Sequence, residues 1–205
     1  LAVIALTTGS ILYYEYRKNQ ANIKIAYYDE LTGLRNNKYL HDYLDHIVAV
    51  PRRRNKAVLL LHVKNLKTVN MTYGFEYGDA LLKQIADKIR QELKTDDNFF
   101  RFDGNQFVVV SDSVEGQEEL RKLAERLICI FDEPVAEGTD LQYVDIQIAI
   151  VEIQARHTST DKILQDALLT FPHIEDNAAH PIVFFDERME KSLQPKQSSL
   201  SATLA

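Results

Sequence analysis

The stretch RFDGNQF, residues 101–107, lies at the centre of the fold that the sequence predicts. Two short apolar runs, residues 99–102 and 106–111, flank Asp103-Gly104-Asn105. Asp, Gly and Asn are the residues that tight turns between strands prefer. The stretch therefore predicts a β-hairpin, and strands joined by so short a turn run in opposite directions.

Outward from this hairpin, helix-type and strand-type apolar periodicities alternate along the chain. Apolar residues at helical spacing predict helices over residues 40–48, 82–93, 120–131 and 161–171. Short apolar or alternating runs predict further strands over residues 57–63, 144–150 and 181–185. Pro51 and Pro134 follow two of the predicted helices and end them. The pattern predicts an α+β domain in which helices flank a central antiparallel sheet.

The composition is that of one globular domain with extensions. The chain has 205 residues, of which 45% are hydrophobic and 26% are charged, which is enough for a core. A net charge of -6 disfavours a nucleic-acid-binding protein, which needs a basic face. The single cysteine, Cys129, excludes an internal disulfide. Its place along the predicted helix predicts a buried, inert thiol.

The first residues form a nearly continuous apolar run, LAVIALTTGSILYY. The run is shorter than the roughly 20 residues that a spanning helix needs. Aromatic residues and then cations follow one another at its end, as at the cytoplasmic exit of a spanning helix. We interpret residues 1–14 as the end of a transmembrane helix and residues 15–26 as a connecting signalling helix. A buried or signal-type apolar helix is the alternative. Residues 190–205 are interpreted as a flexible tail or linker.

Three ordered segments resemble the GGDEF family of diguanylate cyclases. Residues 28–36, YDELTGLRN, resemble the entry motif D-x-L-T-G-L-x-N. Residues 66–82 keep the spacing of F-K-x-x-N-D-x-x-G-H-x-x-G-D-x-x-L, and residues 101–107 fall on the R-[YL]-G-G-D-E-F signature. Residues 183–189 resemble the end of the domain less closely. The resemblance implies a palm-like domain over residues 27–189, preceded by the N-terminal, transmembrane-derived helix.

The resemblance also implies a chemistry, in which two GTP molecules are joined into cyclic di-GMP by a metal-dependent phosphoryl transfer. The metal-ligand positions of the family fall on His62, Val63 and Asn105. Mg²⁺ prefers carboxylates, whereas His is a poor ligand for it and Asn offers a neutral carbonyl. Gln106 replaces another acid of the signature, and Asp103 brings negative charge towards a triphosphate.

We therefore expect a degenerate signature without catalytic residues and without a cofactor; Mg²⁺ would be the cofactor of an active form. The signature positions are Asp103, Gly104, Asn105, Gln106 and Phe107.

Two pairs of residues match the nucleotide contacts of the family. Asn70 and Asp79 fall on the guanine-binding positions, and both residue types can hydrogen-bond a purine edge. The alternative is that they serve as turn and helix-cap residues. Lys94 and Asp97 fall on the inhibitory R-x-x-D site for cyclic di-GMP. Lys in place of Arg loses the planar fork that suits phosphates, so a solvated helix end is the alternative role.

The phosphate-binding Lys and Arg of the family fall near Pro172 and Asp176, so both cations are expected to be absent. Three functions remain open. The first is a catalytically inactive regulatory module of a membrane-anchored protein in cyclic di-GMP signalling. The second is an active cyclase with non-standard metal ligands, and the third is a nucleotide-independent dimerisation or scaffold domain.

The resemblance implies partners and a setting as well. Expected partners are weakly bound GTP or cyclic di-GMP, a second copy of the chain, and an adjacent EAL phosphodiesterase or sensor domain. The N-terminus would contact a membrane, and no nucleic acid is expected. The implied setting is a bacterial inner membrane with the GGDEF-like domain in the cytoplasm.

Overall fold

The computed structural model of the chain describes residues 2–50, 55–93, 98–112, 115–137, 140–175 and 181–192. The helices are α1 (Ala2–Tyr27), α2 (Asn37–Ala49), α3 (Leu66–Tyr73), α4 (Phe75–Leu93), α5 (Gln117–Cys129), α6 (Thr160–Glu175) and α7 (Glu187–Ser192). The strands are β1 (Ala57–Val63), β2 (Phe99–Asp103), β3 (Gln106–Ser111), β4 (Val135–Glu137), β5 (Asp140–Gln142), β6 (Ile146–Glu152) and β7 (Ile182–Phe184).

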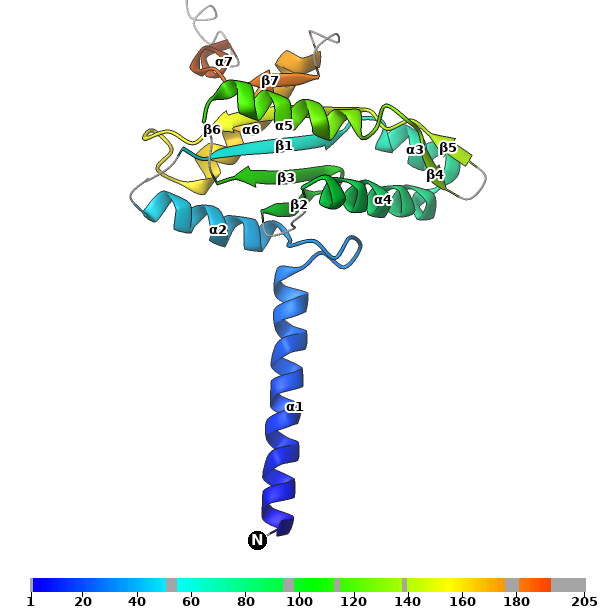
Figure 1. Cartoon of the computed structure of the whole chain (residues 1–205), viewed down its shortest axis with the longest axis vertical. Coiled ribbons are helices and arrows are strands. Elements are labelled where there is room, and N and C mark those ends of the chain that lie inside the picture. The colour runs from blue at the N-terminus through cyan, green and yellow to red at the C-terminus, as the bar shows by residue number, and fades with distance from the viewer. Residues whose placement is uncertain are drawn as a thin grey trace, which may run out of the picture.

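The main sheet has five strands in the order β2-β3-β1-β6-β7 (Figure 1). β1 lies at its centre and pairs antiparallel with both β3 and β6, and β2 pairs antiparallel with β3. The predicted hairpin and the predicted antiparallel sheet are confirmed for these four strands. β7 pairs parallel with β6, because α6 crosses over between the two strands and returns the chain to the same end. The sheet is therefore mixed.

Helices cover both faces of the sheet, as the α+β prediction requires. Leu59 and Leu61 of β1 pack with α4 and α5 on one face, whereas Val58 and Leu60 pack with α2 and α6 on the other. These four side chains have no exposed surface. Successive side chains of a strand point to opposite faces, so the continuous apolar run of β1 is what a strand buried on both faces needs.

The entry motif joins α1 to the domain. The Asp29 carboxylate accepts hydrogen bonds from the backbone N–H and the hydroxyl of Thr32, at 2.8 and 2.7 Å. Asn36 caps α2 through the backbone N–H of Tyr39, at 3.1 Å, and its amide donates to the carbonyl of Ala26, at 3.0 Å. One side chain therefore bonds the end of α1 and the start of α2, which fixes the direction in which α1 leaves the domain.

The segments expected at the N-terminus form one helix that projects from the domain (Figure 1). Ile11, Leu12, Tyr13 and Tyr14 are exposed on it. Within the ranges described above, no helix combines the length and the apolar character that crossing a membrane requires. Residues 190–192 of the expected tail belong to α7, and residues 193–205 lie outside the described part of the chain.

Several features differ from the sequence predictions. α3, α7 and the small β4–β5 hairpin were not predicted, because segments of three to eight residues are too short to show a periodicity. α6 continues beyond its predicted end and holds Pro172 in its last turn. Cys129 is exposed, so the prediction of a buried thiol was wrong. It lies two residues after buried Leu127, which places it about 200° around the helix.

A buried carboxylate anchors α6 to the loop that follows β6. Asp166 has no exposed side-chain surface; Arg156 donates to it, and the Lys162 ammonium lies 3.1 Å from its other oxygen. His157 Nε2 lies 3.1 Å from the carboxylate. The backbone N–H of Gln154 donates to His157 Nδ1, at 2.8 Å. Because Nδ1 accepts, the ring proton of the neutral imidazole is on Nε2, which donates to Asp166.

The same cations hold α7 against the domain. Lys162 lies 2.8 Å from Glu190, and Arg156 lies 3.5 Å from Glu187. Each cation therefore bridges the buried carboxylate of α6 and an acid of α7. Burial, followed by the charge of Arg156, lowers the pKa of His157.

Replacing Asp166 by Asn should lower the free energy of unfolding by about 2–3 kcal/mol, because Arg156, Lys162 and His157 lose the negative charge that they share and one of its two acceptor oxygens. The cations are partly solvated, which keeps the loss below that of a fully buried pair. Denaturant unfolding followed by circular dichroism measures this. Asp161→Asn, an exposed acid in the first turn of the same helix, should cost about 0.5 kcal/mol or less. Equal effects of the two substitutions would contradict the anchoring role of Asp166.

Stability should also fall as the pH decreases from 7 to 5. The pKa of His157 is lower in the folded state than in the unfolded state. The neutral ring therefore makes its full contribution to the free energy of unfolding above the unfolded-state pKa of about 6.5, and this contribution is lost as the pH falls through the folded-state pKa. His157→Gln should weaken this dependence relative to the wild type. His46→Gln, which changes an exposed His, should leave it unchanged. Parallel pH profiles for the two variants would count against this assignment.

Candidate functional site

The tip of the β2–β3 hairpin carries the signature residues. Gly104 has a φ of +25°, which a residue without Cβ adopts at low cost. The Asp103 carboxylate accepts a hydrogen bond from the backbone N–H of Gly104, at 2.9 Å. Asp103 is exposed. Part of the charge that Asp103 adds to the signature is therefore engaged in its own turn.

The Asn105 side chain closes the space between the hairpin and the end of β1. Its amide Nδ2 donates to the carbonyl of Val63, at 2.6 Å, and the backbone N–H of Val63 donates to the carbonyl of Asn105, at 2.9 Å. Two of the three positions on which the metal ligands of the family fall are therefore bonded to each other, and the Val63 carbonyl already accepts an N–H.

The third position is His62, whose side chain lies on the face of the sheet opposite to that of Val63. Its half-buried ring makes an edge contact with Phe171 of α6, with ring centroids 5.2 Å apart. Its neighbours across the sheet are Gln106 on β3 and Gln147 on β6. In the part of the chain that the structure describes, no three His, Cys, Asp or Glu side chains gather as metal ligands would. The residues at this place thus offer imidazole and amide groups in place of carboxylates.

A hollow of about 570 Å³ lies between α3, the start of α4 and the signature turn. Its lining comprises Leu66, Lys67, Asn70, Met71, Phe75, Gly104 and Asn105. Met71 and Phe75 are 79% and 78% exposed at its rim. Sequence reasoning missed both residues, although they stand where the family motif has the Asp after Asn and the His after Gly. The rim is apolar where the family pattern is polar.

Asn70 lies in this hollow with one polar atom unused. Its Oδ1 is buried and has no hydrogen-bond partner among the described residues. Gly78 of α4 makes room for it, because a Cβ on Gly78 would lie 1.7 Å from that oxygen. Asp79 follows Gly78 and is exposed. The two predicted guanine-contact residues are therefore brought to one region, with the Asn70 oxygen facing Gly78 of α4.

Arg101 is a buried residue of β2 that packs against the signature residue Phe107. Its guanidinium lies 4.5 Å from the centre of the Phe107 ring. Burial lowers the pKa of Arg101, and the charges of Asp29, Asp103 and Asp79 oppose this effect. Its backbone N–H donates to the carbonyl of Arg35, at 2.8 Å. Arg101 thus connects the hairpin with the entry motif.

Most of the remaining predicted positions fall outside the part of the chain that the structure describes. Lys94, Asp97 and Asp176 lie outside the described residues. Pro172 is exposed in the last turn of α6. The proposed inhibitory site and one of the two phosphate-binding positions are therefore predictions that the structure does not address.

The chain matches known proteins over most of its length. Residues 26–170 match the family model described as diguanylate cyclase, GGDEF domain. The chain is 27% identical over 180 residues to the bifunctional diguanylate cyclase/cyclic di-GMP phosphodiesterase MucR of Pseudomonas aeruginosa, covering 87% of the chain and 26% of MucR. The chain thus spans about a quarter of this curated relative.

Solved structures share the fold. The GGDEF domain of TpbB (YfiN) from Pseudomonas aeruginosa superposes with a TM-score of 0.73 at 23% identity, covering 82% of this chain and 99% of that one. The coiled coil and GGDEF domain of DgcB from Caulobacter crescentus, in complex with c-di-GMP, gives 0.74 at 16% identity, covering 89% and 97%. The family match, the palm-like α+β fold and the hairpin signature agree, and the chain belongs to the GGDEF domain family.

Proposed function

We propose that this GGDEF domain is a catalytically inactive regulatory module in cyclic di-GMP signalling. The observation that carries the proposal is the hydrogen bond from the Asn105 amide to the Val63 carbonyl. A metal ion that used this carbonyl as a ligand would compete with the N–H donor that the carbonyl already accepts. It would then find neutral oxygens where phosphoryl transfer needs carboxylates to hold Mg²⁺.

The residues present do not fit Mg²⁺. His62 contacts Phe171, Asn105 contacts Val63, and Gln106 is neutral. Imidazole is a ligand for softer metals. Cyclase activity with non-standard ligands, the alternative, would need His62 and Asn105 to leave these contacts, or would need the three neutral side chains to hold Mg²⁺ without a negative charge.

A weakly bound nucleotide is compatible with this proposal. Asn70 lines the hollow, and its amide can bond a purine edge once the side chain turns away from Gly78. Asp79 lies next to Gly78. GTP or cyclic di-GMP would then act as a signal rather than as substrate or product.

The proposed context is a longer, membrane-anchored protein of the bacterial inner membrane, with this domain in the cytoplasm. The chain matches about a quarter of the length of MucR, which is described as a bifunctional diguanylate cyclase and cyclic di-GMP phosphodiesterase. An adjacent EAL or sensor domain and a second copy of the chain are the partners we propose. α1 projects from the domain and carries exposed apolar residues with which it could contact either partner (Figure 1).

The apolar rim favours a second candidate function, a nucleotide-independent dimerisation or scaffold domain. Met71 and Phe75 are large, apolar and about four-fifths exposed beside a hollow. Tyr73 between them is exposed as well, and its ring stacks on Tyr77 with centroids 4.7 Å apart. Exposed apolar groups that gather at one place are typical of protein contact surfaces.

The purified chain should form no cyclic di-GMP from GTP with Mg²⁺ or Mn²⁺, as measured by chromatography of the reaction mixture. The double variant His62→Asp with Asn105→Glu restores two carboxylates and removes the donor to Val63. It should gain metal-dependent GTP binding by calorimetry, with affinity rising about tenfold on adding Mg²⁺. Gln91→Glu, which adds a carboxylate on the exposed end of α4, should gain none. Product formation by the wild type, abolished by EDTA, would refute the proposal.

If the apolar rim is a contact surface, the full chain should self-associate without nucleotide. The double variant Met71→Gln with Phe75→Ser should then raise the dimer dissociation constant about tenfold or more in sedimentation velocity, because it removes exposed apolar area. Leu168→Ser, an exposed apolar residue on α6, should leave the constant unchanged. α1 is present in all three proteins, so a difference between them reports on the rim. Equal constants would count against this surface.

A further inference from the structure

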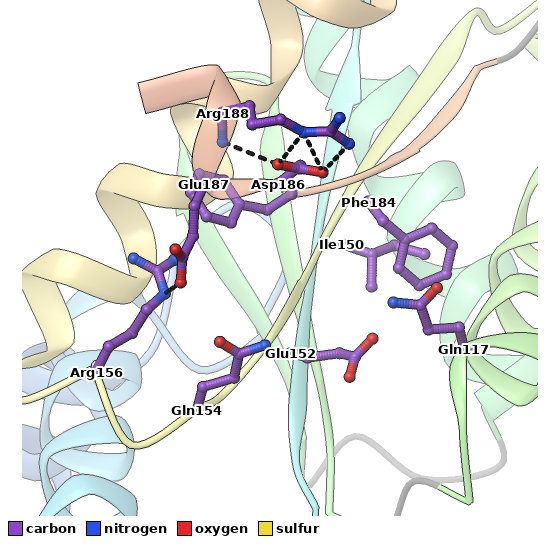
Figure 2. A pocket seen from close by; sticks show the side chains of 10 residues that line it. Gln117, Ile150, Glu152, Gln154, Arg156, Phe184, Asp186, Glu187 and Arg188 are labelled. Atoms are coloured by element: carbon purple, nitrogen blue, oxygen red, sulfur yellow. Dashed lines mark hydrogen bonds and ion pairs between the residues drawn. The ribbon is translucent and has the colours of Figure 1, made fainter. Parts of the chain in front are cut away.

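A second pocket, of about 380 Å³, lies at the other end of the sheet (Figure 2). It is formed by the end of β6, the segment from β7 into α7, and Gln117 at the start of α5. Glu152 in this pocket pairs with Ala57 at the start of β1, whereas the signature turn lies beside Val63 at the end of β1. Six residue steps along a strand separate these ends by about 20 Å. The pocket is therefore distinct from the nucleotide hollow.

Most charges around the pocket are already paired. Arg188 binds Asp186, at 2.6 Å, and Arg156 lies 3.5 Å from Glu187 (Figure 2). Arg156 is further engaged by the buried Asp166, and its guanidinium lies 4.7 Å from the centre of the Phe185 ring. The guanidinium groups of the lining thus have their counter-charges, and an anionic ligand would have to compete with carboxylates for them.

Glu152 is the exception. Its carboxylate points into the pocket between the side chains of Gln117 and Gln154 (Figure 2). It is half-buried, and no hydrogen bond or ion pair joins it to another residue within the described ranges. β6 holds it in place through its pairing with β1. A carboxylate that is partly withdrawn from water without a partner is unfavourable, so a ligand that supplies one gains free energy.

The remaining walls complement a cation that carries N–H groups on an apolar stem. The amide oxygens of Gln117 and Gln154 can accept additional hydrogen bonds. Ile150 and Phe184 supply apolar surface behind Glu152, of the kind on which the methylene groups of Lys and Arg pack.

We propose that this pocket binds a guanidinium or primary ammonium group through Glu152. The source is an Arg or Lys side chain of a protein segment, or a free polyamine, which share this chemistry. The inference does not depend on the proposed function, because it uses no residue of the nucleotide face. A purely structural role is the competing explanation. The N-cap of α5, Gly116, has no side-chain cap, so a nearby carboxylate would offset the positive end of the helix.

The test is an NMR titration of the isotope-labelled full chain with arginine amide and, separately, with spermidine. The backbone signals of Gln117, Glu152 and Gln154 should shift and saturate. Glu152→Gln should raise the apparent dissociation constant about tenfold, since a charge-assisted hydrogen bond is lost. Glu133→Gln, an exposed acid away from the pocket, should leave it unchanged. Tighter binding of arginine amide would identify the ligand as a protein side chain, and tighter binding of spermidine would identify it as a polyamine.

Two results would overturn the proposal: shifts in the wild type that do not saturate, or the same dissociation constant in Glu152→Gln as in the wild type. Thermal unfolding of each variant by circular dichroism keeps the structural explanation separate. If Glu152→Gln lowers the unfolding temperature and the wild type shows no saturable binding, the role of Glu152 is only to stabilise the N-terminal end of α5.

Discussion

The burial of β1 on both faces is the constraint on which the rest of the structure depends. Val58, Leu59, Leu60 and Leu61 have no exposed surface, and each face of the strand belongs to a different hydrophobic cluster. Slipping the register by one residue would exchange the two faces for every side chain. The strand therefore fixes the register of β3 and β6 beside it. This register in turn places the polar residues that lie at the two ends of the sheet.

At one end of β1, the loss of carboxylates changes what holds the signature turn. In the family pattern the turn and the strand end provide ligands for a metal. Here two direct hydrogen bonds join Asn105 and Val63: the Asn105 side-chain amide donates to the Val63 carbonyl, and the Val63 N–H donates to the backbone carbonyl of Asn105. A neutral side-chain amide, unlike a carboxylate, has N–H donors, so it can bond the carbonyl at this strand end directly and without a cation. The same substitution that removes the ligand also supplies a contact within the protein, which explains how the hairpin keeps its shape.

At the other end of the domain, charged groups organise the exit towards α7. Asp166 anchors two cations, and each of them reaches an acid of α7. Arg156 also borders the pocket that contains Glu152. Glu187 and Arg188 of α7 are exposed, and ion pairs that a buried carboxylate holds in place join α7 to the domain. Ion pairs thus contribute to the position of α7, whereas apolar packing fixes the sheet.

The sequence by itself determined the order of the main elements, the hairpin, the family and the replacement of the two signature acids by Asn105 and Gln106, since periodicity, turn residues and motif spacing are local properties. Only the tertiary structure decided which groups meet. The contact of Asn105 with Val63 joins residues 42 positions apart, and no local pattern encodes it. The parallel edge strand, the exposure of Cys129 and the apolar rim also depend on how the elements pack. The lack of a partner for Glu152 among the described residues was decided in the same way, because the polar groups around it come from α5, the loop after β6 and α7, and only packing sets which of them reach one another.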